Sequence, residues 1–164
     1  MAGAGKSTVG KSLAAELGWA FIDTDNLLEA LYACGLQKLA DAAGKKEFID
    51  IEATMIGALK ASRTVIATGG SVVYSDEAVA GLAELGPIVY LKTELATILE
   101  RIALNPERGL ALDPGETAAD LYREREALYE KAANLVCDTS GRSPAECARY
   151  IRDKLENILK RRDD

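Results

Sequence analysis

The chain opens with the stretch MAGAGKST, residues 1–8, in which Gly5, Lys6 and Ser7 are the last three positions of the motif G-x-x-x-x-G-K-[ST] and a threonine follows. Glycines let a backbone turn tightly, so that successive amide groups point at phosphate oxygens. The start of a helix adds the positive end of its dipole. We therefore predict a phosphate-binding loop that runs into a helix over residues 6–17, with Val9, Leu13 and Leu17 on its apolar side.

Each position of this loop has a chemical task. Lys6 neutralises the β- and γ-phosphates of a nucleotide, and the Ser7 hydroxyl binds Mg²⁺. The predicted nucleotide-binding residues of the loop are Gly3, Ala4, Gly5, Lys6, Ser7 and Thr8. The alternative is a glycine-rich helix start that binds no ligand.

The motif is incomplete at its beginning. Its first glycine would stand one position before Met1, and the strand that normally leads into such a loop is missing from the sequence. That strand is central in folds with this loop, so two neighbouring strands would lack backbone partners. We expect residues upstream of Met1 in the natural chain, which the intact mass of natively expressed protein tests.

Short apolar runs alternate with longer helical patterns, which is typical of βαβ units around a parallel sheet. Strands are predicted at residues 21–23, 64–68, 88–91 and 135–138. Helices are predicted at residues 6–17, 26–33, 45–61, 76–84, 95–104, 117–132 and 144–160. Since no linker divides the 164 residues, we expect one domain over residues 1–164, a three-layer α/β/α fold with a central parallel sheet that lacks its first strand.

Composition excludes several classes of function. Hydrophobic residues make up 48% of the chain, but no apolar run approaches the ~20 residues of a membrane span. The complete lack of histidine excludes histidine-dependent nucleophiles and the usual histidine-containing zinc sites. The net charge of −6 argues against a nucleic-acid partner.

Cysteine usage points to the cytoplasm. Cys34, Cys137 and Cys147 are odd in number and lack C-x-x-C spacing, so we expect small buried side chains in a reducing compartment. A disulfide or metal role is the alternative. No basic segment followed by an apolar core stands at the start, so no secretion signal is predicted.

Two acidic residues follow the first predicted strand, in the stretch FIDTD at residues 21–25. Ligands bind at the carboxyl ends of strands in open α/β sheets. The D-x-D spacing places Asp23 and Asp25 on one face of an extended segment, where Asp23 supports Mg²⁺ and Asp25 meets a substrate hydroxyl. The alternative for Asp25 is the N-cap of the next helix.

A long irregular stretch, NPERGLALDPGE at residues 105–116, contains two prolines and two glycines between predicted helices. We interpret it as a mobile lid over the phosphate site, with a plain surface connection as the alternative.

The loop, the FIDTD stretch, TGG at residues 68–70 and YREREALY at residues 122–129 occur in the order found in shikimate kinases. The chain therefore resembles the shikimate kinase family over nearly its whole length. This resemblance implies a P-loop NTPase-type fold and transfer of a phosphoryl group from MgATP to the 3-hydroxyl of shikimate, in aromatic amino-acid biosynthesis. It also implies a cytoplasmic enzyme, which we expect to be a monomer.

The resemblance implies roles for individual residues. Asp23 supports the magnesium ion, and Asp25 contacts the reacting hydroxyl as the base. Gly69 and Gly70 present backbone amides to the substrate, and Arg125 binds the substrate carboxylate.

The remaining implied roles concern the nucleotide and the lid. Lys6 is catalytic together with Arg108, the lid arginine that faces the transferring phosphoryl group. Arg101 flanks the adenine, with Pro144 nearby from the last helix.

The helical pattern supports the role of Arg125 independently. Leu121, Leu128 and Ala132 mark an inward face, and Arg125 lies on the same stripe, whereas Arg123 lies off it. An inward arginine needs an anion, because an unpaired buried charge is costly. That anion is either a ligand or, as the alternative, an internal Asp or Glu.

Three positions depart from the family pattern. An isoleucine, Ile49, replaces the arginine that shares the substrate carboxylate, and Glu52 remains without that cation. Loss of such a charged hydrogen bond costs about 1.5–3 kcal/mol, roughly a ten- to hundredfold weaker binding. Either Lys45 or Lys46 lies at the helical spacing that reaches the same face.

The other two departures are smaller. Ser71 replaces the third glycine of the turn, where it crowds the substrate or supplies a hydroxyl contact. Gly109 replaces a proline in the lid, which loosens the loop.

Three alternatives to a shikimate kinase stay open. The acceptor is another small hydroxy acid or polyol, or the chain is a non-catalytic nucleotide-binding protein. A nucleoside monophosphate kinase fits less well, because the lid region offers only Arg101 and Arg108 for a second phosphate.

Overall fold

The computed structural model describes residues 1–105 and 110–160. The strands of this part are β1 (Ala20–Asp23), β2 (Thr64–Ala67), β3 (Val89–Lys92) and β4 (Leu135–Asp138). Its helices are α1 (Lys6–Leu17), α2 (Thr24–Tyr32), α3 (Leu36–Ala58), α4 (Asp76–Leu85), α5 (Leu95–Ala103), α6 (Ala118–Ala132) and α7 (Pro144–Lys160), and a 3₁₀ turn η1 covers Ser71–Tyr74.

The strands form two parallel pairs. β1 pairs with β2 from Ala20 opposite Thr64, and β3 pairs with β4 from Val89 opposite Leu135. Within the described residues, β2 and β3 are not hydrogen-bonded to each other, so the sheet is split where the sequence predicts two strands without partners. A mainly apolar cavity of about 430 Å³ lies between them.

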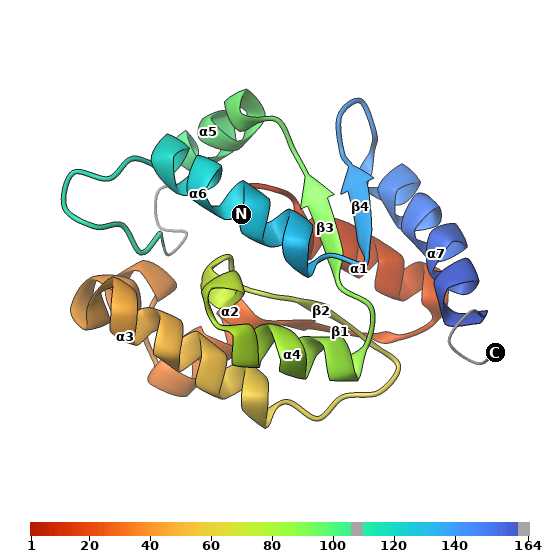
Figure 1. Cartoon of the computed structure of the whole chain (residues 1–164), viewed down its shortest axis with the longest axis horizontal. Helices are drawn as coiled ribbons and strands as arrows, with labels where there is room; N and C mark the ends of the chain where they lie inside the picture. The colour runs from red at the N-terminus through yellow and green to blue at the C-terminus, as the bar shows by residue number, and fades with distance from the viewer. Residues whose placement is uncertain (106–109, 161–164) are drawn as a thin grey trace.

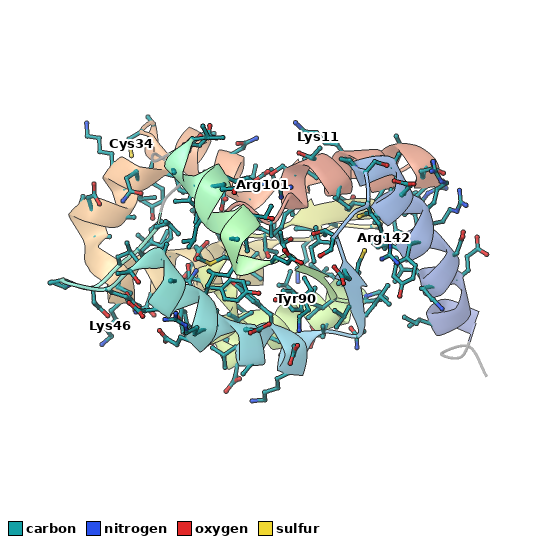
Figure 2. All side chains as sticks on the ribbon, turned by 90° about the horizontal axis from the view of Figure 1, so that it is seen from above. Lys11, Cys34, Lys46, Tyr90, Arg101 and Arg142 are labelled. Atoms are coloured by element: carbon teal, nitrogen blue, oxygen red, sulfur yellow. The ribbon has the colours of Figure 1, made fainter. Side chains whose placement is uncertain are left out.

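Helices cover both sides of the strands. The two views agree that α1 lies on one face and that α4 and α6 lie on the other (Figures 1 and 2). The core against α1 combines Val9 and Leu13 with Leu91 of β3 and Ile151 of α7. This arrangement confirms the predicted three-layer α/β/α class, with two half-sheets in place of one continuous sheet.

Helix α3 is the main difference from the sequence prediction, which begins a helix only at residue 45. The structure continues it back to Leu36, across a break at Gly44 where φ is 75°. Leu36 and Leu39 are buried against Leu28 and Phe48. This packing stabilises the part of α3 before Gly44, where the sequence pattern predicts no helix.

The segment after α5 returns toward α3 (Figure 1). Its described part begins at residue 110, where the Leu110 amide donates a hydrogen bond to Gln37 Oε1 at 3.0 Å. Ala111 is buried in the cluster around Leu28 and Phe48. Leu110 is thus hydrogen-bonded to the N-terminal part of α3, and Ala111 packs in the cluster that this part helps to form.

The structure tests the predictions about the cysteines and about membrane-spanning segments. Cys137 and Cys147 are buried as expected, Cys34 is half-buried, and all three thiols are free. Among the described helices, none combines the length and the apolar character that a bilayer crossing requires.

Candidate active site

The loop before α1 has the backbone geometry of an anion site. Gly3 and Gly5 adopt positive φ angles of 79° and 88°, a conformation in which a side chain would be strained. No side chain caps α1, and the amides of a first helical turn lack partners within the helix. These amides are therefore available to phosphate oxygens, as the sequence predicts.

Two cations donate hydrogen bonds to backbone carbonyls of this loop. Lys6 Nζ donates to the Met1 carbonyl at 2.8 Å, and burial lowers the pKa of Lys6 against the opposing effect of Asp25 and Asp23. Arg101 Nη1 donates to the Gly3 carbonyl at 2.8 Å, and Figure 2 shows this side chain near α1. The structure thus brings Arg101 to the predicted nucleotide loop.

Ser7 and Asp23 form a pair of hard oxygen donors. The Ser7 hydroxyl donates to Asp23 Oδ2 at 2.6 Å. Oxygen donors in small number, completed by phosphate oxygens and water, are the usual environment of Mg²⁺. The donor set therefore fits the predicted magnesium site.

The D-x-D stretch differs from its predicted shape. Asp23 ends β1 and its Oδ1 accepts from the Asp25 amide at 3.1 Å, so it is Asp23 that caps α2. Asp25 consequently lies in the first turn of α2 rather than on an extended segment with Asp23. The helix begins at Thr24, two residues earlier than predicted, because this cap satisfies its first amides.

Asp25 has an unused oxygen. Its Oδ1 is the buried side-chain polar atom that lacks a hydrogen-bond partner within the described residues. Burial raises the pKa of Asp25, with Asp23 and Glu29 acting in the same direction and Lys6 opposing them. An orphaned carboxylate oxygen with a raised pKa is suited to accept a proton from a substrate hydroxyl.

These groups surround one cavity of about 240 Å³. Its lining combines the loop with the ends of β1 and β2, and comprises Ala2, Gly3, Gly5, Lys6, Ser7, Thr8, Asp23, Asp25, Asn26, Glu29, Leu36, Ala67 and Thr68. The sequence-predicted phosphate, magnesium and base residues are therefore brought together.

The glycine turn after β2 is closely packed against neighbouring side chains. The Gly69 amide donates to the buried Thr24 hydroxyl at 3.0 Å, so it is not free for a substrate. A Cβ at Gly69 would stand 1.6 Å from Glu52 Oε1 and 3.0 Å from Asp25 Oδ1. At Gly70 a Cβ would stand 3.0 Å from Arg125 Nη1. The two glycines thus let Asp25 and Arg125 approach the same turn.

Arg125 is a buried cation on α6. It is 3% exposed, and no ion pair joins it to an acid in the part of the chain that the structure describes. Its Nε donates to the Tyr74 hydroxyl at 3.2 Å, and its guanidinium lies 5.0 Å from the Tyr74 ring centroid. The predicted inward orientation is confirmed, and the internal ion pair is not found.

The rest of α6 follows the predicted stripe. Leu121 is fully buried beside Arg125, while Arg123 is exposed and pairs with Asp120 at 3.1 Å. The structure adds Tyr129, whose hydroxyl donates to the Gly70 carbonyl at 2.8 Å.

Glu52 is stabilised without the arginine that the family pattern places at position 49. It is 2% exposed, and the Ser71 hydroxyl donates to its Oε2. Burial, and then the charge of Asp25, raise the pKa of Glu52 to about 8. Ser71 therefore serves this buried acid, not the substrate as the sequence leads one to expect.

We expect Glu52 to make stability fall as pH rises. Its pKa is about 8 when folded against an ordinary 4.5, so the folded state binds the extra proton between these values. The contribution is complete below about pH 4.5 and is lost as pH rises through 8. Each pKa unit corresponds to about 1.4 kcal/mol, so the change amounts to several kcal/mol.

Urea unfolding at pH 6 and pH 8.5 measures this dependence. Glu52→Gln should keep the shape of the neutral acid and flatten the pH profile, whereas Glu47→Gln, an exposed change on the same helix, should not. Equal slopes in all three proteins would contradict the role of Glu52.

Several predicted site residues are not among those that line the 240 Å³ cavity, which leaves out Ala4, Arg101, Gly69, Gly70 and Arg125. Arg108 lies outside the described residues, as does Gly109. Pro144 begins α7 and is exposed, and it is not among the residues that line the 240 Å³ cavity.

Comparison with known proteins agrees with this geometry. The family model for shikimate kinase matches residues 2–156. The chain belongs to the shikimate kinase family. A shikimate kinase of Nitratidesulfovibrio vulgaris is 38% identical over 87% of this chain and 84% of its own length. A shikimate kinase of Thermodesulfovibrio yellowstonii is 36% identical over 95% of this chain and 91% of its own length.

Solved structures agree as well. Shikimate kinase from Acinetobacter baumannii, in complex with shikimate, has a TM-score of 0.84 and 27% identity, covering 95% of this chain and 89% of that chain. The chain is therefore an ATP-dependent phosphotransferase that acts on a hydroxyl group, with a P-loop α/β fold. The sequence prediction of family, fold and reaction class is confirmed.

Three contacts of this site were not predicted from the sequence. Tyr74 joins Arg125, Thr24 holds the Gly69 amide, and Ser71 partners Glu52. None of these pairs has a sequence spacing that predicts contact, since each joins residues 19 to 51 positions apart.

Proposed function

We propose that this chain transfers the γ-phosphoryl group of MgATP to the 3-hydroxyl of shikimate. The observation that carries the proposal is Arg125, a buried cation without a carboxylate partner among the described residues. A buried charge of this kind is costly unless a ligand supplies the anion. The acceptor must therefore bring a carboxylate to the turn at Gly70 while its hydroxyl reaches Asp25.

The chain's own residues divide the work. The loop amides and Lys6 hold the phosphates, and Ser7 with Asp23 hold Mg²⁺. Magnesium, when bound, neutralises charge on the phosphate oxygens. Asp25 accepts the hydroxyl proton at its free Oδ1, and Arg125 orients the acceptor by its carboxylate. Catalysis is then mainly positioning and charge neutralisation.

The other roles are proposed on the same basis. Arg101 holds the loop at Gly3 and borders the nucleotide, with Pro144 contributing from α7. Arg108 faces the transferring phosphoryl group from a lid over residues 105–116. The enzyme works as a single domain and a monomer in the cytoplasm, with no nucleic-acid partner.

A coupled ADP-release assay tests the acceptor. Shikimate should be turned over with an MgATP requirement, and a panel of hydroxy acids and polyols should react at least tenfold more slowly. Faster turnover of another acid would reassign the acceptor. Calorimetric nucleotide binding without turnover of any acceptor would favour the non-catalytic alternative.

A further inference from the structure

Lys45 is surrounded by acids from a distant part of the chain. Its Nζ lies 3.0 Å from Asp113 Oδ2 and 3.1 Å from Glu116 Oε2, and Glu124 Oε2 is 3.9 Å away. Only 17% of the Lys45 side chain is exposed. Asp113 and Glu116 both belong to the segment that follows residues 106–109. Lys45 of α3 therefore joins this segment to α3 by two ion pairs.

The same lysine also lies beside the aromatic ring that contacts Arg125. Its Nζ lies 5.9 Å from the centroid of the Tyr74 ring, and the guanidinium of Arg125 lies 5.0 Å from that centroid. Tyr74 therefore contacts both cations. Lys45 and Arg125 thus meet at one ring, although they come from α3 and α6.

The charges around Tyr74 are unevenly distributed. Lys45 has three carboxylates within 4 Å, whereas Arg125 has none among the described residues. An acceptor carboxylate at Arg125 would place a further anion near Tyr74, whose ring Lys45 also contacts. Ile49, where the family pattern has arginine, supplies no charge.

We propose that Lys45 is the second cation for the acceptor's carboxylate and that Asp113 and Glu116 compete with the acceptor for it. This inference rests on the proposed function. In the free enzyme the two acids occupy Lys45. When the acceptor binds, Lys45 exchanges part of this pairing for the acceptor's carboxylate, which couples acceptor binding to the segment at residues 110–116.

The neighbouring lysine is a matched control. Lys46 is exposed and points outward from α3 in Figure 2. No ion pair involves it within the described ranges. Lys45→Ala and Lys46→Ala therefore remove the same charge from adjacent positions, and of the two only Lys45 contacts Tyr74 and the acids of the 110–116 segment among the described residues.

Steady-state kinetics with shikimate and with its methyl ester tests the inference. We expect Lys45→Ala to raise KM for shikimate about ten- to hundredfold with kcat and the KM for ATP little changed, because a charged hydrogen bond is lost. Lys45→Arg should restore most of the affinity, and Lys46→Ala should change KM less than twofold. With the ester, which lacks the carboxylate charge, wild type and Lys45→Ala should have similar KM values.

The acidic partners separate this role from a structural one. If they compete with the acceptor, the double variant Asp113→Asn, Glu116→Gln should lower KM for shikimate severalfold. If Lys45 only fastens the segment, the double variant should raise KM as Lys45→Ala does, and the ester should show the same loss. Either of these results, or equal KM values for Lys45→Ala and Lys46→Ala, overturns the inference.

Two controls complete the experiment. Thermal unfolding midpoints within a few degrees of wild type show that each variant is folded. Wild-type turnover of shikimate with no effect of Lys45→Ala overturns this inference alone. Lack of wild-type turnover overturns the proposed function together with it.

Discussion

Replacing Lys6 by alanine is expected to reduce kcat/KM for ATP by about 10³-fold. Lys6 is the cation of the loop itself, and its Nζ lies against the Met1 carbonyl within that loop. Removing one preorganised donor to developing charge costs about 10²–10³-fold, and the lost positive charge adds to this. Single-turnover measurements with saturating shikimate quantify the loss.

Lys11→Ala is the control for that experiment. Lys11 also lies on α1, but it is exposed and its Nζ lies 5.8 Å from the Phe21 ring centroid, away from the phosphate cavity. Its removal should change kcat/KM less than twofold. Retention of a tenth or more of the activity by Lys6→Ala would contradict the role of Lys6.

The second large effect is expected from Asp25→Asn, which should lower kcat by about 10²–10⁴-fold. The substitution keeps the size of the side chain but removes the base, and general base catalysis is worth about this factor. KM for shikimate should change little, because an amide oxygen at Oδ1 still accepts a hydrogen bond from the acceptor hydroxyl.

The pH profile adds a second measurement for Asp25. Because burial raises its pKa, the wild-type rate should fall as pH drops through this raised value, where the carboxylate becomes protonated. Asp25→Asn should lack that acidic limb. Asp50→Asn, an exposed change on α3, should keep both the rate and the limb. An acidic limb that persists in Asp25→Asn would assign the titration to another group.

Local patterns predicted much of the fold. Helix α1 has the predicted bounds, and β4 does as well. The phosphate loop, the Ser7 and Asp23 donors and the inward Arg125 were also predicted. Each depends on residues close in sequence, where glycine geometry, helical period or strand termini determine the outcome.

Other features required contacts between distant residues. The N-terminal part of α3 has a weak helical signal and depends on packing against Leu28 and Phe48. The Gly69 amide turned toward Thr24, and the Ser71 hydroxyl turned toward Glu52. No local pattern records these partners, because they meet only when α2, α3 and η1 assemble.

The sequence by itself determined the chemistry of this protein: a loop of glycines with one lysine, an acid at the end of the next strand, and an arginine on the apolar stripe of a helix. Only the tertiary structure decided which of two neighbouring lysines lies beside Tyr74. Lys45 and Lys46 are adjacent and equivalent as residue types, yet one lies beside Tyr74 and the other in solvent. Helical spacing limits which residues share a face, but the burial of a charge depends on what the rest of the chain packs against it.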